Sequence, residues 1–135
     1  MPDHEIARRM LEAARRDLQA IVNMRDPELF RDEIFGLHAQ QAVEKILKGW
    51  LAHRDREVPR THNLRLLLLL LTQAGEEVTG EWDFVDLTPF AVQFRYESWD
   101  ATDAPLDREG VVHKVNALLR RVNGIIDGAS AQASH

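Results

Sequence analysis

The stretch 28–54 constrains the fold more than any other part of the chain. Its apolar residues recur at helical spacing, but they cover a much broader face than the single stripe of a surface helix. A helix with so wide an apolar face must be surrounded by other helices, so we expect it at the centre of a bundle, with Trp50 in the core. The face comprises Phe35, Ala39, Ala42, Ile46 and Trp50, widened by Val43, Leu47 and Leu51.

Three other long segments are typical of helices, and no segment is typical of a strand. The first ends before Pro27, because the residue preceding a proline is forced out of the α region. The third, near 63–74, contains a run of six leucines, so we expect it to be buried on several sides, in part by another chain, before it stops at Gly75. The last is expected to stop at Gly128. The apolar stripes of the first and last helices comprise Ile6, Met10, Ala14, Leu18 and Ile21, and Val111, Val115, Leu118, Val122 and Ile125.

A short helix is predicted at about 90–97, since Thr88 and Pro89 are typical of an N-cap and a first helical position. Together these segments predict an all-α fold, an antiparallel up-and-down bundle of four long helices and a short one. The 135 residues are the usual length of one domain. We expect that domain to span 1–128 and to be followed by a flexible tail, 129–135.

The composition excludes several classes of protein. The absence of cysteine rules out a disulfide scaffold, a cysteine-based metal site and a thiol nucleophile, and it is compatible with the cytoplasmic location that we expect. The longest apolar run, 66–71, is far shorter than the about 20 residues that a membrane span needs, so no membrane association is expected. The histidines are scattered and no glycine-rich phosphate loop occurs, so we expect neither a metal site nor a cofactor.

Charge is segregated along the chain. The net charge of −5 argues against a protein that coats nucleic acid regardless of its sequence. Residues 45–65, however, include six basic and two acidic side chains, whereas 76–109 include two basic and ten acidic ones. The stretch 45–65 is therefore the first place to expect a phosphate contact, and the alternative is a solvated basic end of a helix.

Four polar residues of the second helix recur at steps of three or four and so lie on one face: His38, Gln41, Lys45 and Lys48. Two ammonium groups beside an amide and an imidazole can bind a phosphate or the edge of a ribose. The alternative interpretation is a solvated helix face that binds no ligand, on which Gln40 and Glu44 are neighbours at positions i and i+4.

The second helix also carries a signature that resembles the HEPN domain family (higher eukaryotes and prokaryotes nucleotide-binding). Three further features occur in the order typical of that family and extend the resemblance over about residues 5–126. The signature reads Gln40-Gln41-Ala42-x-Glu44-Lys45-x-Leu47-Lys48, and the other features are Asp17-Leu18, Thr61-His62-Asn63-Leu64 and Arg95-Tyr96. The resemblance implies a helical bundle that is commonly a homodimer and is often encoded beside a minimal nucleotidyltransferase in toxin–antitoxin or defence loci.

Many HEPN proteins are ribonucleases that use an Arg-x4-6-His motif for phosphate stabilisation and acid–base chemistry. No histidine follows Arg95 within that window, because the next one is His113. Two pairs elsewhere have the right spacing, Arg31 with His38 and Arg56 with His62, but chance predicts about as many in a chain with this composition. Catalytic residues therefore stay unknown, and His38 and His62 are the only weak candidates.

Two more groups of residues have a structural and a functional interpretation. His62 follows Thr61, the expected N-cap of the third helix, and in the structural interpretation its ring only closes the turn there. In the functional interpretation, His62 joins Arg60, Lys45 and Lys48 in an anion site at the N-terminus of the third helix. Arg95 and Tyr96 either lock two helices together or contact the ligand.

Three hypotheses about function follow. The first is a dimeric module that binds nucleotide or RNA through His38, Gln41, Lys45, Lys48, Arg60, His62, Arg95 and Tyr96, with a nucleotidyltransferase as its partner. The second is a metal-independent endoribonuclease toxin with a nonstandard Arg/His pair. The third is a purely structural dimerisation subunit.

Overall fold

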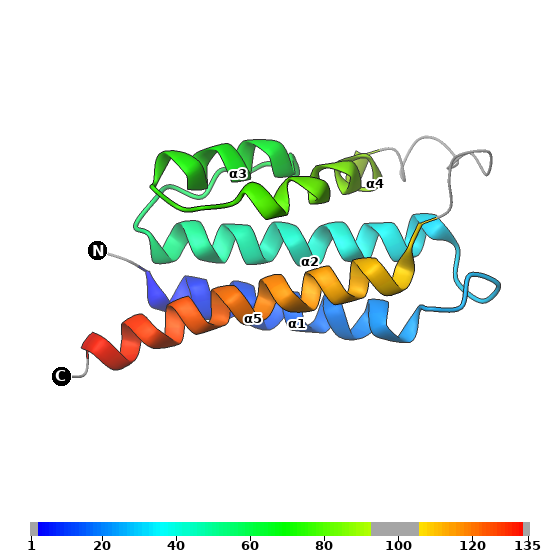
Figure 1. Ribbon diagram of the computed structural model, residues 1–135, viewed down its shortest axis with the longest axis horizontal. Helices are drawn as coiled ribbons and strands as arrows, with labels where there is room; N and C mark the ends of the chain where they lie inside the picture. Colours follow the sequence, from blue (N-terminus) through cyan, green and yellow to red (C-terminus); the bar gives the residue numbers. More distant parts are fainter. Residues whose placement is uncertain (1–2, 93–105, 134–135) are drawn as a thin grey trace.

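The computed structural model describes residues 3–92 and 106–133. Within these ranges the chain is helical and contains no strand, which confirms the predicted all-α bundle (Figure 1). The elements in order are α1 (His4–Asn23), α2 (Asp32–His53), α3 (Leu64–Gln73), the 3-10 helix η1 (Thr79–Leu87), α4 (Thr88–Val92) and α5 (Arg108–Ala133). No helix of the described ranges is long and apolar enough to cross a membrane.

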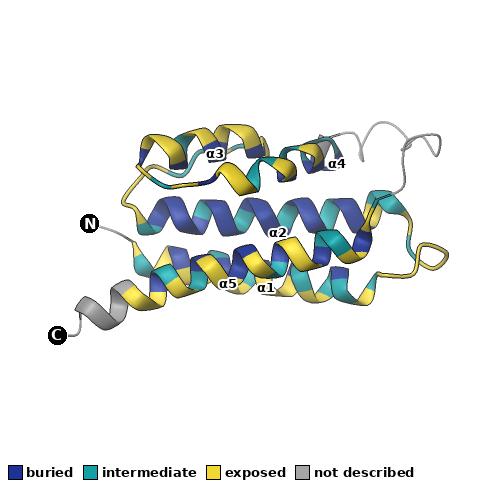
Figure 2. Ribbon diagram, in the orientation of Figure 1, coloured by how far each residue is buried: buried dark blue, intermediate teal, exposed yellow. Residues whose placement is uncertain are grey.

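Helix α2 lies at the centre of the molecule, as its broad apolar face predicts. It contacts α1 and α5 on one side and α3, η1 and α4 on the other (Figure 1). Phe35, Ile46 and Trp50 have no exposed surface, and Figure 2 shows α2 as the most continuously buried of the helices. This helix is therefore the axis around which the hydrophobic core is built.

The buried face of α1 differs from the predicted stripe. Ile6 is 42% exposed, whereas Ala7 and Leu11 are buried. The reason is that α1 packs against both α2 and α5 and approaches α2 very closely. A Cβ added at Gly49 of α2 would lie 3.1 Å from the Ala7 carbonyl oxygen and 3.5 Å from Leu11 Cδ2, so Ala7 and Leu11 face α2 and Ile6 is turned away.

Several helix ends differ from the predicted positions. Helix α2 begins at Asp32 instead of residue 28, because 26–30 form a turn in which the Asp26 carbonyl accepts from the N–H of Phe30. The N-cap of α3 is Asn63, whose Oδ1 accepts from the Leu66 N–H, and not Thr61, whose Oγ1 accepts from the Asn63 N–H.

Three further helix ends were expected at or near glycine and proline. The stop of α3 before Gly75 is confirmed, and this glycine has the left-handed φ of +92° that follows many helices. Helix α5 continues through Gly128 to Ala133, so the stop expected there is wrong. A helix begins at Thr88, but Thr88 itself has helical dihedral angles (φ −52°, ψ −42°) and its Oγ1 accepts from the Leu64 N–H, so the predicted N-cap role is wrong. Most of the expected length of this helix lies outside the described residues.

Arg108 ties the beginning of α5 to the connection between α1 and α2. Its guanidinium donates to the carbonyl oxygens of Met24 and Phe30 at 2.6 and 2.7 Å and to Asp32 Oδ1 at 2.8 Å. It also lies 5.0 Å from the centroid of the Phe35 ring. Only 6% of this arginine is exposed, so nearly all of its donors are turned towards protein acceptors.

Replacing Arg108 should destabilise the bundle strongly. We expect Arg108→Ala to lower the free energy of unfolding by about 3 kcal/mol, because it leaves two carbonyls and a carboxylate without their donor. Urea unfolding followed by circular dichroism measures this. The matched control is Arg120→Ala on the exposed surface of the same helix, which should change the value by less than about 0.5 kcal/mol. Equal effects of the two substitutions would contradict the role given to Arg108.

Candidate functional site

One narrow line of α2 reaches solvent. Most side chains along the second half of the helix are fully buried, whereas His38, Gln41, Lys45 and Lys48 are partly exposed. We call these four residues the α2 stripe. All four belong to the residues that the sequence indicates for ligand binding, and the structure places them along one edge of the central helix.

Two residues of the α2 stripe, His38 and Lys45, contact a carboxylate from α1. Asp17 Oδ1 lies 3.1 Å from His38 Nδ1, and its Oδ2 accepts from Lys45 Nζ at 2.6 Å. The Asp17 side chain is only 12% exposed. Asp17 occupies a buried position between Ala14 and Ile21, so an acidic residue at apolar spacing in α1 is the sequence signal for this cluster. Sequence reasoning used Asp17 only as part of a family signature and missed its contacts.

A second cluster forms around Glu44, which is a buried residue of α2. Its Oε1 accepts from Gln40 Nε2 at 2.9 Å and lies 2.8 Å from His62 Nδ1, while Oε2 accepts from Lys48 Nζ at 3.0 Å. Gln40 Nε2 also donates to the His62 carbonyl at 3.1 Å, and Gln41 donates to Gln40 Oε1 at 2.9 Å. These bonds hold the segment before α3 against the middle of α2.

The Glu44 carboxylate is held in its ionised form. Burial alone would raise its pKa, but the hydrogen bonds from Gln40, His62 and Lys48 outweigh burial and hold the pKa below the usual range of a glutamate. Glu44 is therefore a negative charge at neutral pH, and it fixes the position of Lys48 and of the His62 ring.

The two clusters share one chemical pattern, in which a carboxylate bridges a lysine ammonium and the Nδ1 of a histidine. A carboxylate beside Nδ1 favours a proton on that nitrogen, which leaves Nε2 as an acceptor. The side chains of His38 and His62 are 36% and 53% exposed. Each imidazole is thus oriented from one side and accessible from the other, which suits it to hydrogen bonding or proton transfer with a ligand.

Uncompensated positive charge lies next to the α2 stripe and not on it. Within the described ranges, Arg56, Arg60 and Arg65 are exposed and form no ion pair. Arg54 differs, because its Nε lies 3.2 Å from Glu76 Oε1 and its guanidinium donates to the Ala74 carbonyl. Arg60 lies only two residues before His62, so its charge flanks the Glu44 cluster.

Two of the predicted site residues, Arg95 and Tyr96, lie outside the described residues. Among 3–92 and 106–133, no three histidine, aspartate or glutamate side chains are grouped in a way that could hold a metal ion. The cations that balance Asp17 and Glu44 are lysines of the protein itself.

The chain is a small all-α bundle with a polar site along its central helix, where two carboxylates, Asp17 of α1 and Glu44 of α2, are each paired with a lysine and a histidine. The HEPN domain family matches residues 7–125, which is most of the chain. The chain therefore belongs to the HEPN domain family. Searches of curated proteins and of solved structures gave no match.

The lowered pKa of Glu44 predicts a pH-dependent stability. An ionised Glu44 stabilises the fold at pH values above about 4.3, the usual pKa of a glutamate in an unfolded chain, and this contribution is lost as the pH falls towards the lower pKa of the folded state. We expect Glu44→Gln to cost about 2 kcal/mol at pH 7 and progressively less below pH 4.

Urea unfolding at several pH values measures this difference. Glu57→Gln is the control, because Glu57 is exposed on the segment before α3 and forms no ion pair with the described part of the chain. A Glu44→Gln effect that stays constant from pH 7 to pH 3 would contradict the role of the ionised carboxylate.

Proposed function

We propose that this HEPN protein binds single-stranded RNA or a nucleotide along the α2 stripe, with Arg60 and His62 extending the site onto the segment before α3. The observation that carries the proposal is the arrangement of donors on the one accessible edge of an otherwise buried helix, next to arginines without acidic partners. The family's implied nucleotide binding supports the same interpretation.

The α2 stripe offers donors even though its lysines are paired. A lysine ammonium has three N–H donors, and the bonds of Lys45 to Asp17 and of Lys48 to Glu44 each use one. From His38 to Lys48 the helix rises about 15 Å, which is long enough for more than one phosphate of a flexible strand. Asp17 and Glu44 cancel the charge of the two lysines, so the attraction for a polyanion comes mainly from the neighbouring arginines.

The proposal predicts which cations matter most for RNA affinity. We expect Arg60→Gln to weaken the binding of a fluorescein-labelled oligouridylate about fivefold. The slope of log affinity against log salt concentration should become shallower by about 0.7, because one phosphate contact to a single strand is lost. Fluorescence anisotropy at several salt concentrations measures both quantities. Arg120→Gln removes the same charge from the exposed surface of α5 and should leave both unchanged. Absence of binding by the wild-type protein would refute the proposal.

A second candidate function is metal-independent cleavage of RNA, favoured by the two carboxylate-oriented imidazoles. His38 and His62 have partly exposed side chains whose Nδ1 faces a carboxylate, and an imidazole can accept the proton of an attacking hydroxyl or donate one to a leaving oxygen. The oriented pairs are carboxylate–histidine pairs, so this activity would not need the Arg-x4-6-His motif. The same RNA, run on a denaturing gel in EDTA, separates the two functions: cleavage that His38→Asn or His62→Asn abolishes indicates an enzyme, and intact RNA indicates a binding module.

The proposal includes a homodimer, and a minimal nucleotidyltransferase as the partner that the family implies. Support for the dimer comes from α3, where Leu66 and Leu69 are 38% and 40% exposed although the opposite side of the helix is buried. Large leucine side chains on one accessible face are typical of an interface.

Charge on this face of α3 should therefore separate the two copies. We expect the wild-type protein to have the mass of a dimer in multi-angle light scattering and Leu66→Glu/Leu69→Glu to have that of a monomer with an unchanged circular dichroism spectrum. Ile6→Glu, at a side chain of α1 with 42% exposure, is the matched control and should stay dimeric. A wild-type monomer at every concentration would contradict the interface.

A further inference from the structure

The seam between α1 and α5 is lined by polar side chains that are arranged differently at its two ends. Near the start of α1, these side chains satisfy one another across the seam. Arg15 donates to Asn123 Oδ1 at 2.8 Å, and Arg8 lies 4.0 Å from Asp127. A cavity of about 280 Å³ lies at this end, but the polar side chains that line it are paired with one another, so we call it the paired end of the seam.

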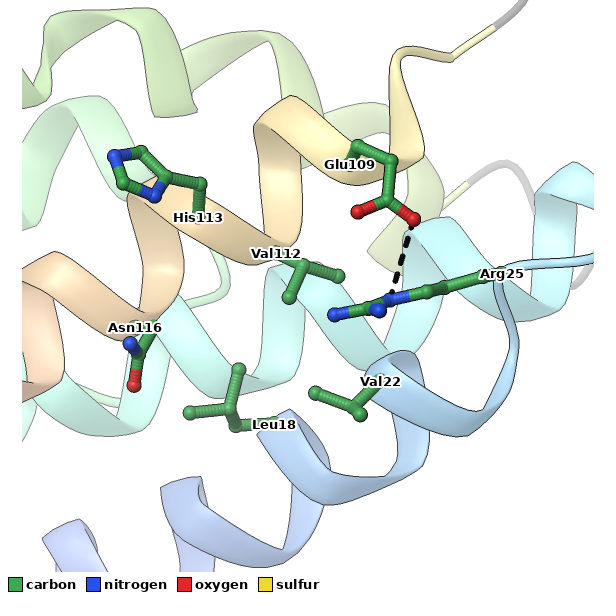
Figure 3. Close-up of a pocket in the computed structure, with 7 residues that line it drawn as sticks. All are labelled: Leu18, Val22, Arg25, Glu109, Val112, His113 and Asn116. Carbon is green, nitrogen blue, oxygen red and sulfur yellow. Dashed lines mark ion pairs between the residues drawn. The ribbon is translucent and has the colours of Figure 1, made fainter.

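At the other end of the seam a cleft of about 330 Å³ remains open (Figure 3). That volume is at the lower limit of small-molecule sites and is sufficient for a molecule with one ring. The cleft has apolar walls from both helices and polar groups at its rim. Its lining residues are Leu18, Val22, Arg25, Glu109, Val112, His113 and Asn116.

The polar groups of this cleft are incompletely paired. Arg25 contacts Glu109 Oε1 through Nε at 3.3 Å, and Figure 3 shows its two terminal nitrogens extending over the cleft between Val22 and Val112. Within the described part of the chain, the side chains of His113 and Asn116 form no hydrogen bond or ion pair. Arginine, imidazole and amide thus leave donors around apolar side chains, in contrast to the paired side chains at the other end of the same seam.

The geometry points to a binding site for a small organic carboxylate with an apolar ring or branched body. The planar guanidinium of Arg25 presents two parallel N–H groups, which match the two oxygens of a carboxylate. Leu18, Val22 and Val112 offer the apolar contact that the body of such a molecule needs.

The charge of the cleft selects a monoanion and not a nucleic acid. Of the described residues that line it, Arg25 is the single arginine or lysine, and Glu109 lies beside it. A phosphate dianion or an RNA strand would meet this carboxylate with too little positive charge to balance it. The cleft shares no residue with the α2 stripe, so the inference is independent of the proposed function.

Glu109 competes with the ligand for Arg25. Its side chain is 71% exposed and holds Arg25 only through Nε. Replacing Glu109 with glutamine removes a negative charge from the rim without removing the arginine, and we expect the affinity for a carboxylate to rise about threefold. An increase in affinity on removing a lining residue is a result that damage to the fold cannot produce.

Benzoate is the probe, and benzamide is its uncharged counterpart of the same shape. Titration of the labelled full-length protein, followed by two-dimensional amide NMR, should shift the resonances of the cleft residues with a Kd of about 1 mM for benzoate. Benzamide and the Arg25→Gln variant with benzoate should each bind about tenfold more weakly. Arg15→Gln at the paired end of the seam is the matched control and should leave the benzoate-dependent shifts of the cleft residues as in the wild type.

Two results would overturn the inference. One is the absence of benzoate-dependent shifts at the cleft residues up to about 20 mM, the weakest affinity that a ligand of this size would show in a formed site. The other is equal affinity for benzoate and benzamide in the wild-type protein, which would mean that Arg25 does not recognise the carboxylate. The second comparison uses only the wild type, so it holds whether or not any variant folds.

Discussion

The near-complete burial of α2 is the constraint on which the rest of the structure depends. A helix that contacts every other element leaves water access along one narrow line, so each charged group near that line must find a partner in the protein. Asp17 and Glu44 meet this requirement by binding Lys45 and Lys48 and by orienting His38 and His62. The polar site of this HEPN protein is therefore a consequence of how its core is packed.

The same pairing changes how the basic character of the chain is understood. The stretch 45–65 has a positive balance, but its two lysines are neutralised by Asp17 and Glu44, which both lie outside the stretch, and Arg54 is paired with Glu76. The remaining positive charge lies on exposed arginines around the start of α3. Under the proposed function, the exposed arginines would attract an anionic ligand and the hydrogen-bonded groups of the α2 stripe would position it.

Local sequence rules predicted the parts of the fold that depend on local physics. The broad apolar face of α2 indicated its central place, and Gly75 and Thr88 indicated the end of one helix and the start of another. The rules failed where distant segments decide the outcome. Ile6 is exposed because α1 turns Ala7 and Leu11 towards α2, and α5 continues through Gly128 because a single glycine weakens a helix without ending it. Local rules gave no indication of the role of Arg108, because its three acceptors come from residues 76–84 positions earlier in the chain.

The order of amino acids alone was enough to define a helical bundle, its central helix, the polar line along that helix and the family resemblance. These features follow from helical periodicity and from a signature within one segment, and both are local properties. The hydrogen-bond partners of the α2 residues were decided only by the tertiary structure. Asp17 on α1 and His62 before α3 reach α2 through the packing of distant segments, which residue spacing within one helix does not predict. The open cleft between α1 and α5 arose in the same way, since it depends on which side chains of two helices distant in the chain do not reach one another.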